Sequence, residues 1–304
     1  MVGRILELSR DNLAVHKSRG FLSVRQGGAE IGTAELDDLD AVLVSAQGVM
    51  WSNRALSQLA TQNVPVMILG ANFAPNAVVL PLCGHGEQGY RMRHQAAASL
   101  PVQKQIWARL VRHKIAAQVA VLDTVGVDSE RMKRLSYSVK SGDPDNREGQ
   151  AAQAYWPLLF GKFFRRDRDM QGANSLLNYG YAVLRAATAR AIVSSGLHPS
   201  LSVHHKSGGD PLALADDLME PFRPTIDRTV YTLIEQGVAE VPDARATLVG
   251  TLRLNFKTDQ GVSPLAQVLV RLAQSLAKSF EEKKPKLAFP HTLLPMEEQD
   301  NDNS

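Results

Sequence analysis

Residues 3–36, GRILELSRDNLAVHKSRGFLSVRQGGAEIGTAEL, decide how the chain begins to fold. Apolar and polar residues alternate through this stretch, which is the pattern of strands that bury one face. Turn-forming residues interrupt the alternation at Arg10-Asp11-Asn12 and at Gly27-Gly28. The sequence therefore predicts several short strands joined by tight turns.

The strand pattern continues to about residue 81. AVLVSA (residues 41–46) bears a continuous apolar run, which is typical of a buried strand. Ser52 can cap a helix over residues 53–62, and the apolar run that follows Pro65 predicts a strand ending at Gly70. We therefore expect residues 1–81 to form a small β-rich domain with one helix.

The pattern becomes helical after a Gly-rich segment, which we interpret as a linker over residues 82–91. From residue 92 onward apolar residues recur every three to five positions, at Val102, Ile106, Leu110, Ile115, Val119 and Leu122. Further helices are predicted over residues 127–139, 146–160, 172–196, 211–220, 225–237, 242–257 and 262–282. The predicted fold class is α+β, with a larger all-helical domain at residues 92–295 and a disordered tail at residues 296–304.

Length and composition limit the function without identifying it. The 304 residues, 44% of them hydrophobic, suffice for two domains, and the net charge of +3 is no sign of nucleic acid. The middle of the chain is more basic, with Lys162, Arg165, Arg166, Arg168, Arg185, Arg190 and Lys206 against Asp167 and Asp169. This segment suits a phosphate backbone, and it equally suits a solvated helical face.

The sequence also bears on redox state and location. Cys83 is the only cysteine, which excludes an intramolecular disulfide and a thiolate zinc cluster. The N-terminus lacks a signal pattern, and no apolar run reaches the roughly 18 residues that span a bilayer. We expect a soluble, cytoplasmic protein without a membrane partner.

Three segments of the chain carry candidate metal ligands. They are Glu148, His205 and Glu220, the last with Asp217 one turn before it. Carboxylate and imidazole ligands without a thiol suit Mg²⁺ or Mn²⁺ better than a structural zinc ion. Enzymes that break and join phosphodiester bonds usually contain such an ion beside basic residues.

Two of these segments also have a purely structural interpretation. Glu148 completes a capping box that begins at Asp145, although small residues at 151 and 152 would leave room beside it for an ion or a phosphate. His204 and His205 lie in a turn-rich segment that should be exposed, where a histidine pair needs no function.

The third segment, around Asp217 and Glu220, also allows both a functional and a structural interpretation. Asp210-Pro211 can start a helix in which Asp217 and Glu220 share a face. Pro221 ends this helix and places Glu220 at a break, with Arg223 close by. A solvated acidic face would have the same pattern.

Four motifs resemble CRISPR-associated protein 1, the spacer-acquisition integrase. They are EGQAAQAYW (residues 148–156), NSLLNYGYAVL (174–184), GLHP (196–199) before the histidine pair, and DLMEPFRP (217–224). The phrases LLNYGYAVL and DLMEPFRP are long and specific, and they are most similar to the form that accompanies type II CRISPR systems. The resemblance covers nearly the whole chain, although at the N-terminus it is only architectural.

This resemblance implies a homodimeric, metal-dependent DNA integrase and endonuclease that inserts short DNA fragments into a CRISPR repeat array. The implied partners are DNA, CRISPR-associated protein 2 and, as a candidate, the type II effector nuclease. The catalytic metal ligands of the family fall on Glu148, His205 and Glu220, with His204 and Asp217 as rivals. We expect the β-rich domain to form the dimer contact through a strand edge.

The expected DNA contacts are Lys206 and Arg223 as phosphate clamps, and Arg165, Arg166 and Arg168 along the backbone. Two other classes of function fit the same residues. One is a stand-alone metal-dependent nuclease that cleaves branched or single-stranded DNA. The other is a non-catalytic DNA-binding scaffold, in which Glu148 and Glu220 only cap and terminate helices.

Overall fold

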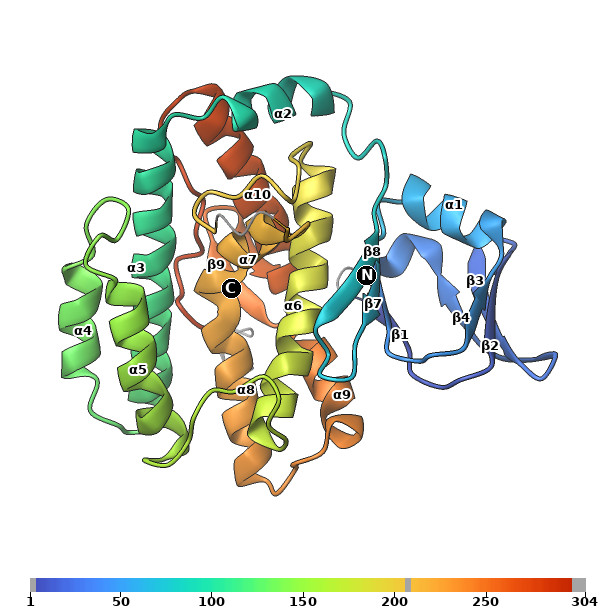
Figure 1. Ribbon diagram of the computed structural model, residues 1–304, viewed down its shortest axis with the longest axis horizontal. Helices are drawn as coiled ribbons and strands as arrows, with labels where there is room; N and C mark the ends of the chain where they lie inside the picture. Colours follow the sequence, from blue (N-terminus) through green and yellow to red (C-terminus); the bar gives the residue numbers. More distant parts are fainter. Residues whose placement is uncertain (1–3, 206–208, 297–304) are drawn as a thin grey trace.

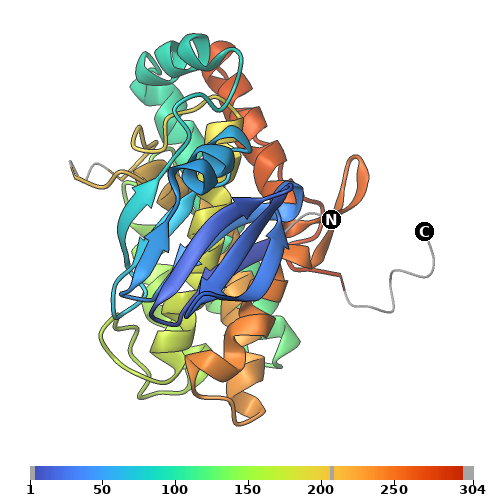
Figure 2. The same cartoon turned by 90° about the vertical axis from the view of Figure 1, so that its right-hand side faces the viewer.

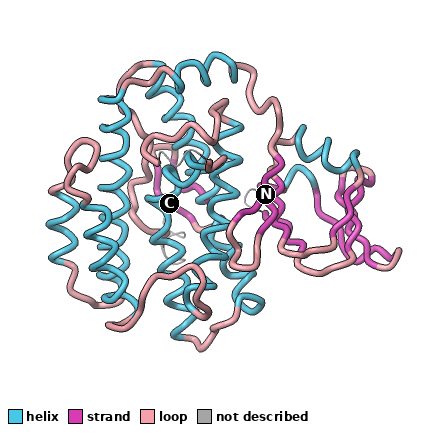
Figure 3. Tube along the Cα trace, viewed as in Figure 1, coloured by secondary structure: helices cyan, strands magenta, loops and turns pink. Residues whose placement is uncertain are grey.

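The computed structural model describes residues 4–205 and 209–296, and it divides into a strand-rich N-terminal part and a mostly helical C-terminal part (Figures 1 and 3). The N-terminal strands are β1 (Arg4–Leu8), β2 (Leu13–Ser18), β3 (Phe21–Gln26), β4 (Ala29–Glu35), β5 (Leu39–Val44), β6 (Val49–Trp51), β7 (Val66–Leu69) and β8 (Pro75–Val79), with helix α1 (Asn53–Thr61) between β6 and β7. The predicted α+β class and the predicted N-terminal helix are confirmed.

The helical part contains α2 (Gln88–Ala96), α3 (Leu100–Thr124), α4 (Glu130–Tyr137), α5 (Arg147–Phe160), α6 (Ala173–Ser194), α7 (Ala213–Met219), α8 (Arg223–Glu235), α9 (Val241–Gly250) and α10 (Leu265–Glu281). The apolar positions predicted to face the core between Val102 and Leu122 are all buried. Among the described helices, none is both long and apolar enough to cross a bilayer.

The N-terminal strands form two sheets that face each other (Figure 2). One has the order β1-β5-β7-β8, in which β1, β5 and β7 are parallel, and the other has the order β4-β3-β2-β6. Gly27 and Gly28 join β3 to β4 with φ of 57° and 86°, a conformation that glycine adopts without strain. Because β4 ends its sheet, its outer edge is unpaired within the described chain.

Strand β5 lies between two hydrophobic cores, which explains its apolar run at residues 41–44. Val42 and Val44 belong to the core between the two sheets and α1, whereas Ala41 and Leu43 belong to the core of the helical part. All six residues of β5 are buried. The first sheet is therefore a shared layer, and α6 packs on its outer face (Figure 1).

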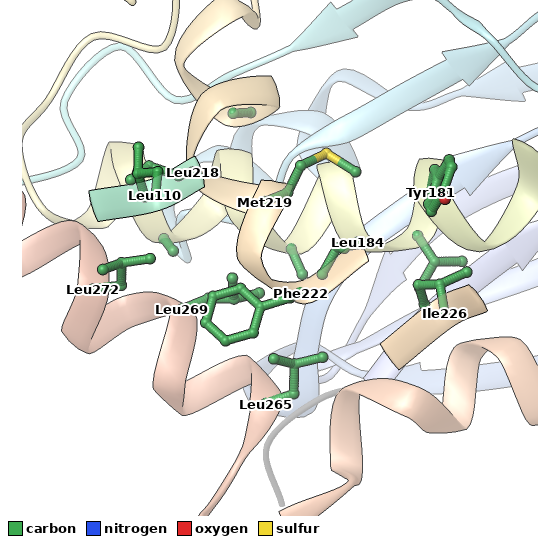
Figure 4. Packing of buried hydrophobic residues seen from close by; sticks show 14 of the residues in the cluster. Leu110, Tyr181, Leu184, Leu218, Met219, Phe222, Ile226, Leu265, Leu269 and Leu272 are labelled. Atoms are coloured by element: carbon green, nitrogen blue, oxygen red, sulfur yellow. The ribbon is translucent and has the colours of Figure 1, made fainter. Parts of the chain in front are cut away.

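Helix α6 is the centre of the helical core and packs against α7, α8, α9 and α10. Figure 4 shows Leu184 close to Phe222, near Leu265 and Leu269 of α10, with Ile226 on the side of Tyr181. Gly180 allows α8 to come this close, because a Cβ at this position would lie 2.4 Å from Ile226 Cγ2. The glycine in NYGY therefore has a packing role.

The C-terminal part is mostly helical, so the expectation of an all-helical domain is wrong. Strands β9 (Asn255–Thr258) and β10 (Gly261–Pro264) form an antiparallel hairpin where we predicted the end of one helix and the start of the next. Gly261, with φ of 92°, supports the turn between them. The sequence Asp259-Gln260-Gly261 is a hairpin signal that the helical interpretation overlooked.

Helix α2 begins inside the segment that we interpreted as a linker, residues 82–91. Gln88, its first residue, accepts a hydrogen bond from the Gly84 N–H at 2.7 Å and donates one to the Leu82 carbonyl at 3.0 Å. A long polar side chain thus organises a segment whose glycines suggested only a loop. At the other end, the Met296 N–H donates to the Asn255 carbonyl, and the rest of the predicted disordered tail lies outside the described residues.

Candidate active site

A cavity of about 870 Å³ lies between the β7–β8 connection and the helical part. Glu148, His205 and Glu220 all line it, although they come from three separate segments of the chain. Ala152, one of the small residues expected to leave room beside Glu148, also lines the cavity. The fold therefore brings the three predicted ligands to one space.

Lys114 of α3 lies between two of these carboxylates, and sequence analysis did not identify it. Its Nζ is 2.5 Å from Glu148 Oε1 and 2.5 Å from Glu220 Oε2, so these two oxygens are at most twice that distance apart. Burial alone would lower the pKa of Lys114, but the charges of Glu220 and Glu148 outweigh burial and raise it. The sequence did contain a signal for its burial, because Lys114 lies four residues after Leu110 and therefore on the same buried face of α3.

Glu220 is placed by the end of α7. The helix stops at Met219, and Glu220 begins a 3₁₀ turn, Glu220–Phe222, that contains Pro221. Arg223 Nε lies 2.9 Å from Glu220 Oε1, as expected from the sequence. Burial would raise the pKa of Glu220, but Arg223 and Lys114 outweigh it and lower the pKa, so the carboxylate is ionised.

Asp217, predicted to lie beside Glu220, has its own set of partners. It is fully buried, and its Oδ2 accepts hydrogen bonds from the N–H groups of Val203 at 2.6 Å and His204 at 2.9 Å. Its Oδ1 lies 2.5 Å from His205 Nδ1. Glu220, by contrast, contacts Lys114 and Arg223, so the two acids have different partners.

This hydrogen bond orients the His205 ring. It raises the pKa of His205, since a proton on Nδ1 is shared with the Asp217 carboxylate. With Nδ1 engaged by Asp217, Nε2 is the ring nitrogen left to meet a ligand, an arrangement common in metal-binding histidines. The His205 side chain is 44% exposed and lines the cavity.

His204, the rival of His205, has a different environment. Its ring stacks on Trp107 with the ring centroids 4.1 Å apart and the planes 1° apart. Burial against this helix lowers its pKa. The two adjacent histidines therefore face different surroundings, and His205 is the one beside Glu220.

Glu148 lies in the first turn of α5, but the capping box predicted from Asp145 is wrong. The N-cap is Asn146, whose Oδ1 accepts a hydrogen bond from the Gly149 N–H at 3.1 Å. Asp143 accepts hydrogen bonds from the backbone N–H groups of residues 147 and 148. These two residues satisfy the helix start, so the Glu148 carboxylate is available to the cavity.

Arg166 is held at the cavity wall by the NSLLNYGYAVL motif. Its guanidinium donates to Asn174 Oδ1 at 3.0 Å and to Asn178 Oδ1 at 2.6 Å. Both asparagines are neutral, so the charge of Arg166 is not cancelled by them. A fixed cation with uncancelled charge suits a phosphate group.

The other predicted DNA contacts differ in position. Arg168 is exposed and lines the cavity, whereas Arg165 is exposed but is not among the lining residues. Arg223 lines the cavity, and its guanidinium lies 4.6 Å from the centre of the Tyr181 ring. Lys206 lies outside the described residues.

Further charged groups of the cavity wall were not predicted as site residues from the sequence. Arg185 Nη2 lies 2.6 Å from Asp210 Oδ2 and 2.7 Å from Asp216 Oδ2, and burial raises the pKa of Asp216 to about 6. Asp227 is buried and accepts a hydrogen bond from the Tyr181 hydroxyl. Burial raises the pKa of Asp227 to about 7.

The donor set of the cavity fits a divalent cation. Two carboxylate oxygens, one each from Glu148 and Glu220, already flank one positive charge. As placed, however, no three carboxylate, imidazole or thiol groups among residues 4–205 and 209–296 converge closely enough to enclose an ion. The ammonium of Lys114 fills the position between Glu148 and Glu220.

Comparison with known proteins places the chain in a family. The model of the family described as CRISPR associated protein Cas1 matches residues 6–260. The CRISPR-associated endonuclease Cas1 of Neisseria meningitidis serogroup C is 35% identical over 286 residues, covering 92% of this chain and 93% of that protein.

Two solved structures share the fold at a TM-score of 0.78. One, a casposase bound to integration product, is 23% identical and covers 98% of this chain and 97% of its own. The other, a Cas6-RT-Cas1–Cas2 complex, is 20% identical and covers 95% of this chain and 36% of its own. With the family match over most of its length and this fold, the chain belongs to the Cas1 family of CRISPR-associated proteins.

Proposed function

We propose that this protein is a metal-dependent DNA endonuclease and integrase that inserts short DNA fragments into a CRISPR repeat array. Family membership supports this proposal, together with a relative named an endonuclease and a structural neighbour bound to integration product. The observation that carries it is the pair of carboxylates, Glu148 and Glu220, facing one cation in a cavity lined by arginines.

Glu148, Glu220 and His205 would hold the divalent ion, which is Mg²⁺ or Mn²⁺. Two carboxylates and one neutral imidazole suit these ions and leave positions for substrate oxygens. Asp217 would act through His205, because its hydrogen bond to Nδ1 directs the lone pair of Nε2 to the site. Asp217 is therefore assigned as a positioning residue, and His204 is held against Trp107.

The reaction is a transesterification at phosphorus. The 3′-hydroxyl oxygen of the fragment forms a bond to a phosphorus of the repeat and loses its proton, while the bond from that phosphorus to the repeat 3′ oxygen breaks and that oxygen takes up a proton. When bound, the divalent ion would supply Lewis-acid stabilisation of the attacking and departing oxygens. Water in place of the hydroxyl gives hydrolysis, so the same site would also act as a nuclease.

The basic residues of the cavity would bind the nucleic acid. Arg166, fixed by two asparagines, would contact a non-bridging phosphate oxygen, and exposed Arg168 would contact the backbone further out. Arg223 would compensate the charge of Glu220 during the reaction. DNA affinity should therefore fall steeply as salt concentration rises.

The proposed assembly is a homodimer that binds CRISPR-associated protein 2. The partner is proposed because a solved structure with this fold is a Cas1–Cas2 complex. Within the described residues the outer edge of β4 has no partner strand, and this edge, with Ile31 half exposed, supports the dimer contact expected for the β-rich part. Light scattering at micromolar concentration tests the dimer, and a monomer would contradict it. Contact with the type II effector nuclease stays a prediction.

A strand-transfer assay tests the function. A labelled fragment is incubated with a repeat-containing plasmid and Mn²⁺, with and without the partner subunit. We expect Glu148→Gln and Glu220→Gln each to reduce joined product by about a hundredfold or more, because a neutral amide is a poor ligand for a hard ion. The control is Glu130→Gln, an exposed glutamate of α4.

The outcomes separate the alternative functions. Cleavage of branched or single-stranded DNA without joined product would favour a stand-alone nuclease. Joining at the wild-type rate by Glu148→Gln would refute the assignment of the site. Absence of Mn²⁺ binding, with both glutamine variants behaving as wild type, would favour a DNA-binding scaffold.

A further inference from the structure

Lys114 combines three properties that a surface ion pair lacks. It is buried on the core face of α3, it contacts carboxylates from two distant segments, and it lines the cavity of the site. Lys133 provides a contrast, because it also contacts two carboxylates, Asp123 and Glu130, but its side chain is 38% exposed. The burial of Lys114 between two carboxylates therefore indicates a role in the site.

The ammonium and a divalent ion exclude each other at this position. Nζ lies 2.5 Å from one oxygen of each glutamate, and an ion bound by the same oxygens would lie about 2.0–2.2 Å from them. The two positive charges would then be nearly superimposed in a buried site, where like charges repel strongly. Lys114 has to move when the ion binds.

The cavity beside Lys114 has room for its side chain in a second position. The lysine side chain is a flexible four-carbon stem, and the adjoining cavity is large and is also lined by Arg166 and Arg168. Arg223 has less freedom, because its guanidinium is held by Glu220 and by the face of Tyr181. Lys114 is therefore the cation that can exchange its carboxylate partners for another group in the cavity.

We propose that Lys114 is an internal counter-cation that holds Glu148 and Glu220 together before the metal ion binds, and then turns into the cavity to hold a DNA phosphate. The inference rests on the proposed function and adds a positioning residue to it. Lys114 thus keeps the two carboxylates in place before the metal ion binds. Because the ion has to displace Lys114, the apparent affinity of the site for the metal is weaker. It also couples metal binding to the appearance of a phosphate-binding cation.

The first test measures Mn²⁺ binding by isothermal titration calorimetry without DNA. Lys114→Met keeps the side-chain length and removes the competing charge, so we expect Mn²⁺ to bind about tenfold tighter or more. Thermal unfolding should show a lower melting temperature for the variant without metal and a larger rise when Mn²⁺ is added. Lys133→Met, the matched control, should bind Mn²⁺ as wild type does.

The second test uses the wild-type protein and does not depend on the stability of a variant. An amine-acetylating reagent followed by mass spectrometry reports the exposure of each lysine. Lys114 should be protected without metal, become labelled when Mn²⁺ is added, and be protected again when a short DNA duplex is added as well. Labelling of Lys133 should not respond to Mn²⁺.

The results distinguish failure of this inference from failure of the proposed function. Equal Mn²⁺ affinity of wild type and Lys114→Met, or Lys114 labelling that ignores Mn²⁺, overturns the inference and leaves the metal site intact. If neither protein binds Mn²⁺, both the inference and the proposed metal chemistry are overturned. Tighter binding by the variant, or metal-dependent labelling, supports both.

Discussion

Replacing Asp217 by asparagine separates a positioning role from direct metal binding. The carboxylate accepts hydrogen bonds from the Val203 and His204 N–H groups through Oδ2 and contacts His205 Nδ1 through Oδ1. An asparagine keeps the shape but has only one acceptor oxygen. Either the backbone pair or the imidazole must lose its acceptor.

Each orientation of the amide has its own consequence. If the amide nitrogen faces the backbone, two N–H groups lose an ionised acceptor, worth about 1.5–3 kcal/mol each, so the loop at residues 203–205 loses roughly 3 kcal/mol or more. If the amide nitrogen faces His205, it donates to Nδ1, which moves the imidazole proton to Nε2. The imidazole then has no lone pair for a metal ion.

Hydrogen exchange and calorimetry distinguish these outcomes. In the first orientation the Val203 and His204 amides should exchange about a hundredfold faster, since about 1.4 kcal/mol corresponds to a factor of ten. In the second, amide exchange should stay slow while Mn²⁺ affinity falls. The control is Asp243→Asn, at an exposed position in the first turn of α9. Unchanged exchange together with unchanged Mn²⁺ affinity would refute the reasoning.

Three further changes test the fold around the site. Gly180→Ala places a Cβ 2.4 Å from Ile226 Cγ2 and should lower the free energy of unfolding by about 1–3 kcal/mol in urea titration, and by less when it is introduced into the Ile226→Ala variant. Burial raises the pKa of Asp227 to about 7, so the stability that its protonated carboxyl contributes is complete below about pH 4 and is lost as the pH rises to about 7. Asp227→Asn has no carboxyl proton to lose, so its free energy of unfolding should gain up to about 4 kcal/mol relative to wild type between pH 4 and pH 8, and parallel pH curves would contradict this. Tyr179→Phe removes a 2.8 Å hydrogen bond to the Glu7 carboxylate between the two parts of the chain, and should cost about 1.5–3 kcal/mol in the same titration; no loss would show that this bond does not stabilise the contact.

Much of the secondary structure could be predicted because it depends on local patterns. The buried face of α3, the turn at Gly27-Gly28 and the buried strand β5 follow from periodicity and turn chemistry. The hairpin of β9 and β10 was missed, since its short strands lie between two strongly helical segments and only Gly261 marks the turn. Local signals this brief are easily outweighed by the helical pattern around them.

The site itself was only partly accessible from the sequence. Its motifs indicated which acids and histidines to consider, but not which of them line the cavity and which position a neighbouring side chain. Asp217 and Glu220 are three residues apart, yet Asp217 contacts the loop at 203–205, whereas Glu220 contacts Lys114 and lines the cavity. These partners lie in other segments of the chain, and local spacing does not specify them.

The amino-acid sequence by itself determined the α+β class, most helix positions and the family, because periodicity, turn residues and long motifs are properties of contiguous segments. Tertiary structure alone decided that Lys114 faces Glu148 and Glu220. A buried charge finds its partners only when distant segments pack together, since desolvation rewards whichever opposite charges the fold brings within a few ångströms.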